Sequence, residues 1–167
     1  SWDLLFFYST QYLFYTMTKG LTAGEILKVD AFYPLFIIIM QLPAAICADF
    51  LGRKKSLILG NLIMSVYILL LIVLPGFWGI FVANIVYAFG YSLKGLQETN
   101  ILYDSTATKG GEGLYPKING KGATGYYMVD GIASLTAGYL FVINEYLPMI
   151  FCLIATIIST IIAINFK

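Results

Sequence analysis

The segment from Ala48 to Ser56, ADFLGRKKS, interrupts a very apolar chain with one acid, one glycine and three consecutive bases. Of the 167 residues, 59% are hydrophobic and only 11% are charged. Soluble domains carry about a quarter charged residues, so this composition indicates an integral membrane protein. The net charge of +1 gives no reason to expect a nucleic-acid partner. The fold therefore depends on where the chain crosses the lipid bilayer and on which side its bases lie.

Six apolar segments predict six transmembrane helices, which makes the chain an all-α polytopic membrane bundle. Most of them approach the ~20 residues that a bilayer requires. A cytoplasmic connection over 94–121 separates the fourth segment from the fifth, and we expect the fourth to continue as a helix towards Ser105. The predicted segments are 2–18, 31–50, 56–74, 77–93, 122–143 and 147–166.

Helix-capping and helix-breaking residues set several boundaries. Thr22 and Glu25 match a capping box, T-x-x-E, so we expect the second helix to begin there. The Pro75-Gly76 pair ends the third helix. Two prolines fall inside the second helix, Pro34 and Pro43, and they predict a bend that neighbouring helices can accommodate.

The bases lie mostly on one side of the predicted membrane. With six spans the loops alternate between two sides, and eight of the ten bases fall on the same side. The positive-inside rule places this side and both termini in the cytoplasm. We therefore expect a multi-pass protein of the inner or plasma membrane, with ADFLGRKKS as a tight cytoplasmic turn. The eight bases are Arg53, Lys54, Lys55, Lys94, Lys109, Lys117, Lys121 and Lys167, against Lys19 and Lys28.

Residue patterns for enzyme or cofactor chemistry are lacking. The chain has no histidine, which removes His-based triads and His-based metal sites. Cys47 and Cys152 lie in apolar runs, and we interpret them as small buried hydrophobes. The glycine-rich stretch 110–122 would need a glycine at Tyr115 and a hydroxyl residue at Gly122 to form a phosphate-binding loop. We expect no enzyme, no cofactor and no ATP-driven pump, and we interpret this stretch as a flexible connection.

The stretch ADFLGRKKSLILG resembles the cytoplasmic loop motif of the major facilitator superfamily, G-x-L-A-D-x-x-G-R-[RK]. Ala45 replaces the first glycine of that motif, and Phe50 stands where the family often has a base. Two further stretches, 101–105 (ILYDS) and 114–122 (LYPKINGKG), resemble the end of helix 4 and the helix 4–5 connection of bacterial members. The residues that match the loop motif are Asp49, Gly52, Arg53 and Lys54.

This resemblance implies that residues 1–167 are the N-terminal six-helix half of a bacterial secondary transporter. Members of the family carry twelve helices in two halves, and the aspartate and arginine of this loop latch helix 2 to the opposite half. Asp49 and Arg53 would then belong to a cytoplasmic gate, and Gly52 would permit its sharp turn. A plain positive-inside anchor is the alternative explanation for Lys54 and Lys55.

Polar side chains inside the predicted spans mark a candidate substrate cavity. Tyr8, Gln11 and Tyr15 share one face of the first helix if that helix is regular. The tyrosines could instead pack or form an interfacial belt, and the amides could bond between helices. The predicted cavity residues are Tyr8, Gln11, Tyr15, Gln41, Asn84, Tyr87, Tyr91 and Tyr127.

Asp130 is the one acid well inside a predicted span, which makes it a candidate for ion coupling. An acid near the centre of a membrane helix costs about 2.5–3.5 kcal/mol on insertion scales, so some gain should offset that cost. Proton coupling and pairing with Lys94 are both open explanations. We interpret Asp3 and Asp30 as ordinary interfacial charges. The helix-4 arginine of many proton-driven exporters is absent from 83–92, which leaves the coupling ion open.

The predicted function is secondary active transport of a small molecule by alternating access. The partners would be the substrate, the lipid bilayer and a second six-helix half, supplied by the same polypeptide or by a second copy of this chain. A homodimeric half-size transporter and a non-transporting membrane scaffold or sensor are the alternatives. Aromatic and amide side chains suit sugars, amphiphilic drugs and peptides alike, and the direction of transport is open.

Overall fold

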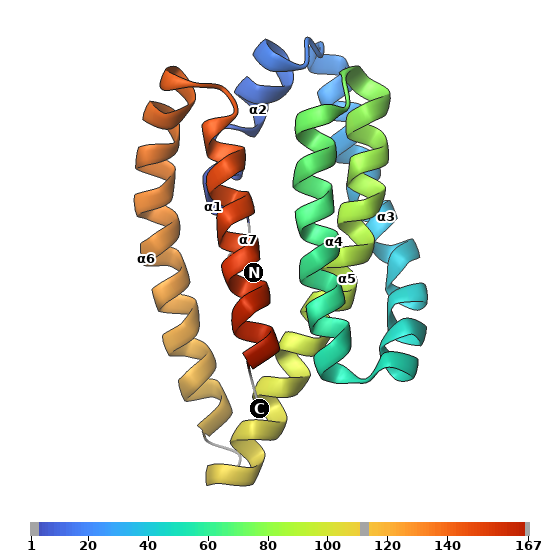
Figure 1. The fold of residues 1–167 in the computed structure, drawn as a ribbon, viewed down its shortest axis with the longest axis vertical. Coiled ribbons are helices and arrows are strands. Elements are labelled where there is room, and N and C mark those ends of the chain that lie inside the picture. The colour runs from blue at the N-terminus through green and yellow to red at the C-terminus, as the bar shows by residue number, and fades with distance from the viewer. Residues whose placement is uncertain (1–3, 111–113, 166–167) are drawn as a thin grey trace.

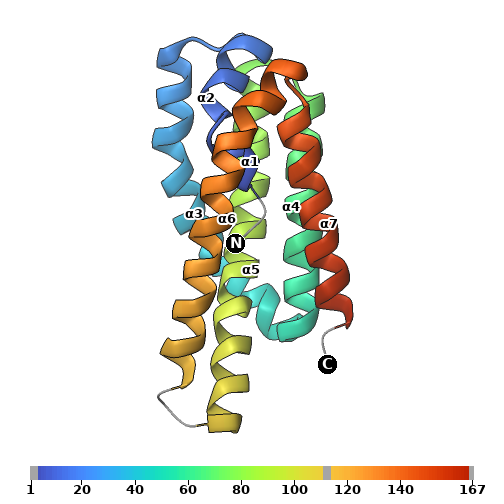
Figure 2. The same ribbon diagram turned by 90° about the vertical axis from the view of Figure 1, so that its left-hand side faces the viewer.

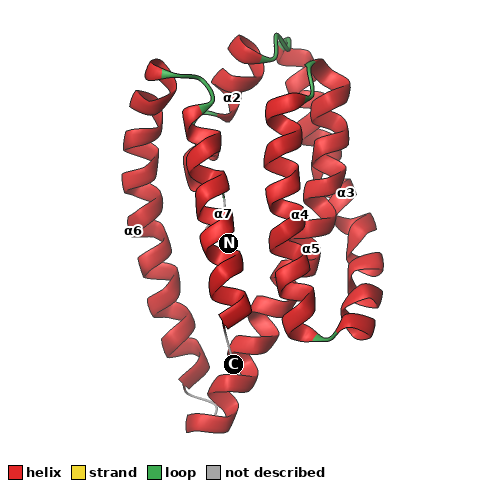
Figure 3. Ribbon diagram, in the orientation of Figure 1, coloured by secondary structure: helices red, strands yellow, loops and turns green. Residues whose placement is uncertain are grey.

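A computed structural model describes residues 4–110 and 114–165, with the side chains of 107–110 left out. Throughout this part the chain is helical, and its long helices run up and down as one bundle (Figures 1 and 3). The predicted all-α class is therefore confirmed. The helices are α1 (Leu5–Tyr8), α2 (Gln11–Leu13), the π-helix η1 (Phe14–Thr18), α3 (Ala23–Leu51), α4 (Arg53–Val73), α5 (Gly76–Gly110), α6 (Leu114–Ile143) and α7 (Leu147–Asn165).

Five of the described helices, α3 to α7, are long and apolar enough to cross a membrane. The chain is thus a helical membrane protein, but the count of six regular spans is not confirmed. The first predicted segment is broken into α1, α2 and η1, which lie in the upper half of the bundle as drawn in Figure 2. The position of Asp3, the side chain of Lys109 and the position of Lys167 fall outside the described residues.

Hydroxyl side chains bond to backbone carbonyls within the irregular first segment. Thr10 donates to the carbonyl oxygens of Phe6 at 3.1 Å and Phe7 at 3.3 Å, and Thr16 donates to the carbonyl oxygen of Tyr12 at 2.8 Å. Such bonds compete with the backbone ladder of a helix and often bend it. The segment then widens into η1, whose carbonyl at Phe14 accepts from the Lys19 amide at 3.1 Å. The assumption of one continuous helical face is therefore wrong for this segment.

Helix α3 begins and bends where the sequence predicts. Thr22 and Glu25 form the complete capping box, with the Glu25 carboxylate accepting from the Thr22 amide at 2.9 Å. Both Pro34 and Pro43 lie inside the helix. Figures 1 and 2 show α3 changing direction part-way down, as expected when prolines remove backbone donors.

Within the connection predicted over 94–121, the helix expected to continue towards Ser105 is present, whereas the interpretation of 110–122 as a flexible connection is wrong for 114–122, which are helical. Helix α5 continues to Gly110 and α6 already begins at Leu114, so only 111–113 lie between them, outside the described residues. Pro116 sits in the first turn of α6, where its missing N–H removes no helical bond. Together the two helices extend the bundle at its lower end (Figure 1).

Close contact between glycines brings α4 and α5 together. A Cβ added at Gly60 would lie 2.9 Å from Lys94 Cβ and 3.2 Å from the Gly90 oxygen. A Cβ at Gly90 would lie 2.8 Å from Ile63 Cγ2. Small residues at such points let helix backbones approach within a membrane. This contact places α5 at the centre of the fold. In the most apolar 18-residue stretch of α5, 44% of the residues are buried, compared with 11% in the corresponding stretches of α3 and α6.

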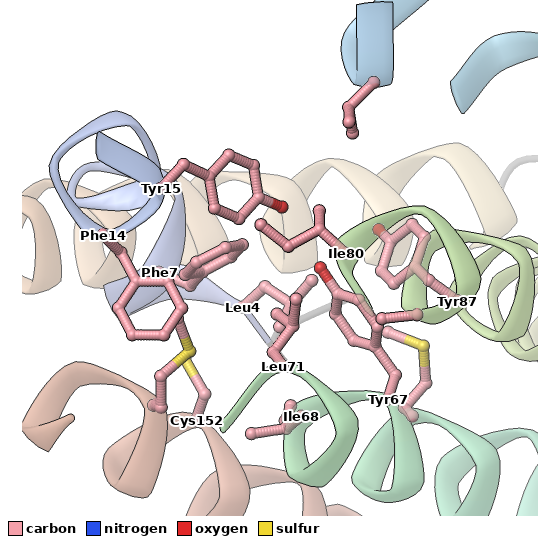
Figure 4. Packing of buried hydrophobic residues seen from close by; sticks show 14 of the residues in the cluster. Leu4, Phe7, Phe14, Tyr15, Tyr67, Ile68, Leu71, Ile80, Tyr87 and Cys152 are labelled. Atoms are coloured by element: carbon pink, nitrogen blue, oxygen red, sulfur yellow. The ribbon is translucent and has the colours of Figure 1, made fainter. Parts of the chain in front are cut away.

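The core fills the upper half of the bundle between the broken first segment, α4, α5 and α7. Phe7, Phe14 and Tyr15 bury almost their entire side chains, and Figure 4 shows them beside Cys152 of α7. Their rings meet edge-on, with centroids of Phe7 and Tyr15 5.9 Å apart. Cys152 is buried as predicted, whereas Cys47 is only half-buried.

Candidate functional site

A cavity of about 430 Å³ lies between the first segment, α3, α4 and α5. Its lining is mostly aromatic and polar, and Asp30 is the only charged residue that the described part of the chain contributes to it. The lining residues are Leu4, Phe7, Tyr8, Gln11, Tyr12, Ile26, Asp30, Tyr33, Tyr67, Asn84 and Tyr87.

Tyr87 of α5 is the centre of a tyrosine cluster at this cavity. Its hydroxyl lies 2.9 Å from the hydroxyl of Tyr8, so the two share a hydrogen bond. Its ring lies 4.8 Å from the ring of Tyr67, 5.5 Å from Tyr33 and 5.6 Å from Tyr91, measured between centroids. Figure 4 shows Tyr67 and Tyr87 facing one another across α4 and α5. One side chain thus links four helical segments.

The structure brings together half of the predicted cavity residues. The cavity of about 430 Å³, which we call the main cavity because the tyrosine cluster lies there, is lined by Tyr8, Gln11, Asn84 and Tyr87. Asn84 is nearly buried and donates its amide to the Ile80 carbonyl of its own helix at 3.0 Å. This bond is not the interhelical bond that the sequence left open.

Tyr15 departs from the predicted face because the first segment is not one helix. Its side chain is 1% exposed and belongs to the core cluster, while Tyr8 and Tyr12 are about half exposed at the cavity. The break after Tyr8 and the wide turn of η1 rotate Tyr15 inward. The structure therefore places Tyr15 in the core, with its hydroxyl beside the cavity residues Gln11, Tyr67 and Asn84.

The remaining predicted residues line two other hollows. Gln41 and Tyr91 border a space of about 480 Å³ between α3 and α5, together with Lys94 and Glu98. Tyr127 borders a third, of about 340 Å³, between α5 and α6. The ring of Tyr91 stacks on the ring of Tyr87, so the hollow between α3 and α5 adjoins the main cavity.

Three polar cavity residues were not predicted as cavity residues: Asp30, Tyr33 and Tyr67. Asp30 and Tyr33 are spaced i, i+3 on α3, a spacing that puts them on one helical face with Ile26 and could have identified them. Tyr67 lies on α4, a helix for which no cavity residue was predicted. Asp30 is therefore a cavity residue and not an ordinary interfacial charge.

Lys94, which the positive-inside count assigns to the cytoplasmic side, is buried inside the bundle. Its side chain is 2% exposed, and its Nζ lies 3.4 Å from the Glu98 carboxylate one turn further along α5. Glu98 itself borders three hollows. Asp130 on α6 is half-buried and forms no ion pair within the described chain, so the proposed pairing of Lys94 with Asp130 is not observed.

The stretch ADFLGRKKS contains the end of α3, a turn of one residue at Gly52 and the start of α4. Gly52 has φ +77° and connects α3 directly to α4, and its amide donates to the Ala48 carbonyl at 2.9 Å. Arg53 then forms an ion pair with Asp104 on α5. Asp49 and Lys54 are exposed, and neither has an ion-pair partner among the described residues.

At the opposite end of the bundle, Lys19 holds the first segment against α4. Its Nζ donates to the carbonyl oxygens of Ile72 at 3.0 Å and Leu74 at 2.9 Å. Partial burial lowers the pKa of Lys19, and the nearby Glu145 carboxylate opposes this shift. Glu145 also accepts from the Thr18 hydroxyl at 2.8 Å. Polar contacts therefore hold the first segment, α4 and the α6–α7 connection together at the upper end of the bundle.

Comparisons with known proteins add no assignment to this site. No protein-family model matches the chain, and no match is found among curated proteins. Among the described residues there is also no cluster of metal-ligating side chains. The features that bear on function are therefore the cavity, the turn at Gly52 and the sequence motif around that turn.

Proposed function

We propose that this chain is the N-terminal six-helix half of a major-facilitator-type secondary transporter that moves a small molecule by alternating access. The observation that carries the proposal is the cavity centred on Tyr87, which is polar and aromatic and lies between the broken first segment and three helices, α3, α4 and α5, that are long and apolar enough to span a membrane. Binding sites for small molecules are typically hollows of 300–1,000 Å³ with a few polar groups, and this cavity falls in that range.

The depth of the cavity suits a transported solute. Tyr87 lies about 16 Å along α5 from its first residue, Gly76. The hydrocarbon core of a bilayer is about 30 Å thick, so Tyr87 would lie near its midplane. Substrate sites of secondary transporters are found at this depth. A purely structural tyrosine cluster would not require a cavity there.

The turn at Gly52 supports the gate in this proposal. The ion pair between Arg53 and Asp104 ties the turn to α5 within the same half. Asp49 at the end of α3 stays exposed and is free to contact a second half. In the proposed mechanism the Arg53–Asp104 pair holds the turn rigid, Lys54 is an exposed part of the motif, and Asp49 forms and loses a contact as the halves rock. The resemblance of ADFLGRKKS to the family motif also supports this role.

Two acids are available for ion coupling. Asp130 remains our first candidate because it is half-buried within α6 without an ion-pair partner in the described chain. Glu98 is the second because it borders three hollows and contacts buried Lys94. A proton or sodium ion could neutralise either carboxylate as the cavity changes access.

The proposed protein lies in the cell membrane with both termini in the cytoplasm, which puts Arg53, Lys54 and Lys55 inside. Its second half comes from the same polypeptide or from another copy of this chain. The intact mass of the natural protein separates these two assemblies. A mass of twice 18.5 kDa or more indicates a second half in the same chain, whereas 18.5 kDa requires a homodimer.

The test of transport uses the natural protein at its full length in sealed proteoliposomes. Labelled solutes, namely a disaccharide, a dipeptide and an organic cation, are offered under an imposed proton or sodium gradient. We expect accumulation of one of them against its own gradient, and an ionophore should abolish it. Solute binding without any gradient-driven movement would refute transport and favour the scaffold or sensor alternative.

A further inference from the structure

The charge of the main cavity is one-sided. Among the residues that the structure describes, Asp30 is the only charged one in the lining, and no lysine or arginine contributes to it. Asp30 is exposed and sits about 10 Å along α3 from Ala23, on the same face as Tyr33 one turn deeper. A positive ligand can therefore meet a carboxylate at the rim, whereas an anion would meet only repulsion.

The aromatic part of the cavity complements the carboxylate. Six of the described lining residues carry aromatic rings. The rings of Tyr33 and Tyr67 both contact the ring of Tyr87, with centroids 5.5 Å and 4.8 Å from it. The face of an aromatic ring carries negative potential and attracts cations, most strongly where water is excluded. Alkylammonium groups are recognised in this way by rings gathered around a cavity.

Much of the hydrogen-bonding capacity in the cavity is already used within the protein. The hydroxyls of Tyr8 and Tyr87 bond to one another, and the amide nitrogen of Asn84 bonds to the Ile80 carbonyl. A sugar would need several of these groups to be free, because its hydroxyls lose water on entering the cavity. Ring faces and one carboxylate make the stronger recognition surface.

We infer that the cavity between Asp30 and Tyr87 binds a monovalent organic cation, an amine or quaternary ammonium that carries an apolar group. The inference rests on the proposed function in taking this cavity as the site of the transported solute. The cationic centre lies between Asp30 and the tyrosine rings, and the apolar group packs towards Phe7 and Ile26. Binding requires no covalent or redox step.

The first experiment measures binding and not transport. The natural full-length protein in lipid nanodiscs is titrated with radiolabelled benzyltrimethylammonium, and binding to empty nanodiscs is subtracted. Unlabelled benzyltrimethylammonium, its uncharged carbon analogue neopentylbenzene, benzoate and maltose then compete for the site. We expect saturable binding, with the cation competing at least about tenfold better than neopentylbenzene because ring and carboxylate attraction both depend on charge. Absence of saturable binding, or displacement by benzoate or maltose, would overturn the inference.

Matched variants locate the site. Asp30→Asn should weaken cation binding about fivefold or more, while Glu145→Gln removes a carboxylate at the same end of the bundle but outside the cavity and should leave binding unchanged. Tyr33→Phe keeps the ring and should bind nearly as well, whereas Tyr33→Leu should bind about threefold to tenfold more weakly. Equal loss from Asp30→Asn and Glu145→Gln would contradict this site. If Asp30→Asn does not yield a monodisperse protein, the Tyr33 pair and the wild-type competition still decide.

The binding experiment and the transport experiment can fail independently of one another. Saturable cation binding without gradient-driven uptake in proteoliposomes would keep this inference and remove the proposed transport. Gradient-driven uptake of maltose without cation binding would keep the transport and remove this inference.

Discussion

Arg53 on the first turn of α4 forms an ion pair with Asp104 near the lower end of α5, far along the chain from it. The turn at Gly52 is thereby tied to the helix that also carries Asn84, Tyr87 and Lys94. A movement of α5 at the cavity is thus coupled mechanically to the turn between α3 and α4. This connection gives the predictions on the turn a functional as well as a structural consequence.

The Arg53–Asp104 pair should contribute little to stability on its own. Both side chains are about half exposed, at 52% and 53%, and exposed pairs are typically worth about 0.2–1 kcal/mol. We expect a double-mutant cycle of Arg53→Gln and Asp104→Asn to give a coupling free energy below about 1 kcal/mol by thermal or chemical unfolding. The reversed pair, Arg53→Asp with Asp104→Arg, should restore transport that each single change reduces. A reversed pair no better than the single variants would show that the contact itself is unimportant.

The conformation of Gly52 should be the more sensitive feature of the same turn. Its φ of +77° disfavours any side chain, although a Cβ there would meet no atom within 4 Å. We expect Gly52→Ala to destabilise the protein by about 1–2 kcal/mol through backbone strain alone. The measurement is the midpoint of thermal unfolding in detergent.

Gly138→Ala is the matched control for Gly52→Ala. Gly138 lies in helix α6, has open space around its Cα and has no positive φ. Alanine there should be neutral or stabilising by a few tenths of a kcal/mol, up to about 1. Equal losses from the two substitutions would contradict an origin in backbone conformation.

Substitution of Gly60 by alanine should destabilise the protein for the opposite reason, namely that there is no space for a Cβ. A Cβ at this position would lie 2.9 Å from Lys94 Cβ and 3.1 Å from the Lys94 amide nitrogen. The backbone of α5 must then move away from α4, and overpacking of this kind costs about 1–3 kcal/mol. We expect Gly60→Ala to lower the unfolding midpoint and also to weaken solute binding, because α5 carries Tyr87. Gly95→Ala on α5, which has open space, should leave the unfolding midpoint close to that of the wild type.

The long helices follow from the sequence because their signals are local. The capping box at Thr22 fixes the start of α3, and the Pro75-Gly76 pair separates α4 from α5. One boundary, the start of α6, was misjudged where local signals conflict. Glycines in 110–122 suggested a loop, yet α6 begins at Leu114 because glycines with open space around them cost a helix only about 1 kcal/mol each.

The site was less predictable because it depends on packing between segments. The spacing of Tyr8 and Tyr15 predicts one face only for a regular helix, whereas the segment breaks after Tyr8 and widens into the π-helix η1. The burial of Lys94 depends on the close approach of Gly60 from another helix. Neither feature leaves a periodic pattern in the sequence.

Substitution of Asp130 should separate ion coupling from a purely structural role. In the proposed mechanism Asp130→Asn prevents protonation of this carboxylate, so solute accumulation should fall and its dependence on the proton gradient should disappear. Exchange of solute without a gradient should persist, because the main cavity does not include Asp130. Both rates are measured in proteoliposomes over a range of pH, with unfolding midpoints as a check on folding.

Glu98→Gln serves as the comparison because it removes the other candidate carboxylate. Glu98 contacts buried Lys94 at 3.4 Å, so its loss leaves a desolvated ammonium without this partner, whereas Asp130→Asn leaves no such charge. If Asp130 is the coupling residue, Glu98→Gln should lower stability but keep the pH dependence of transport. Unchanged pH dependence in Asp130→Asn, together with its loss in Glu98→Gln, would transfer the coupling role to the Lys94–Glu98 pair.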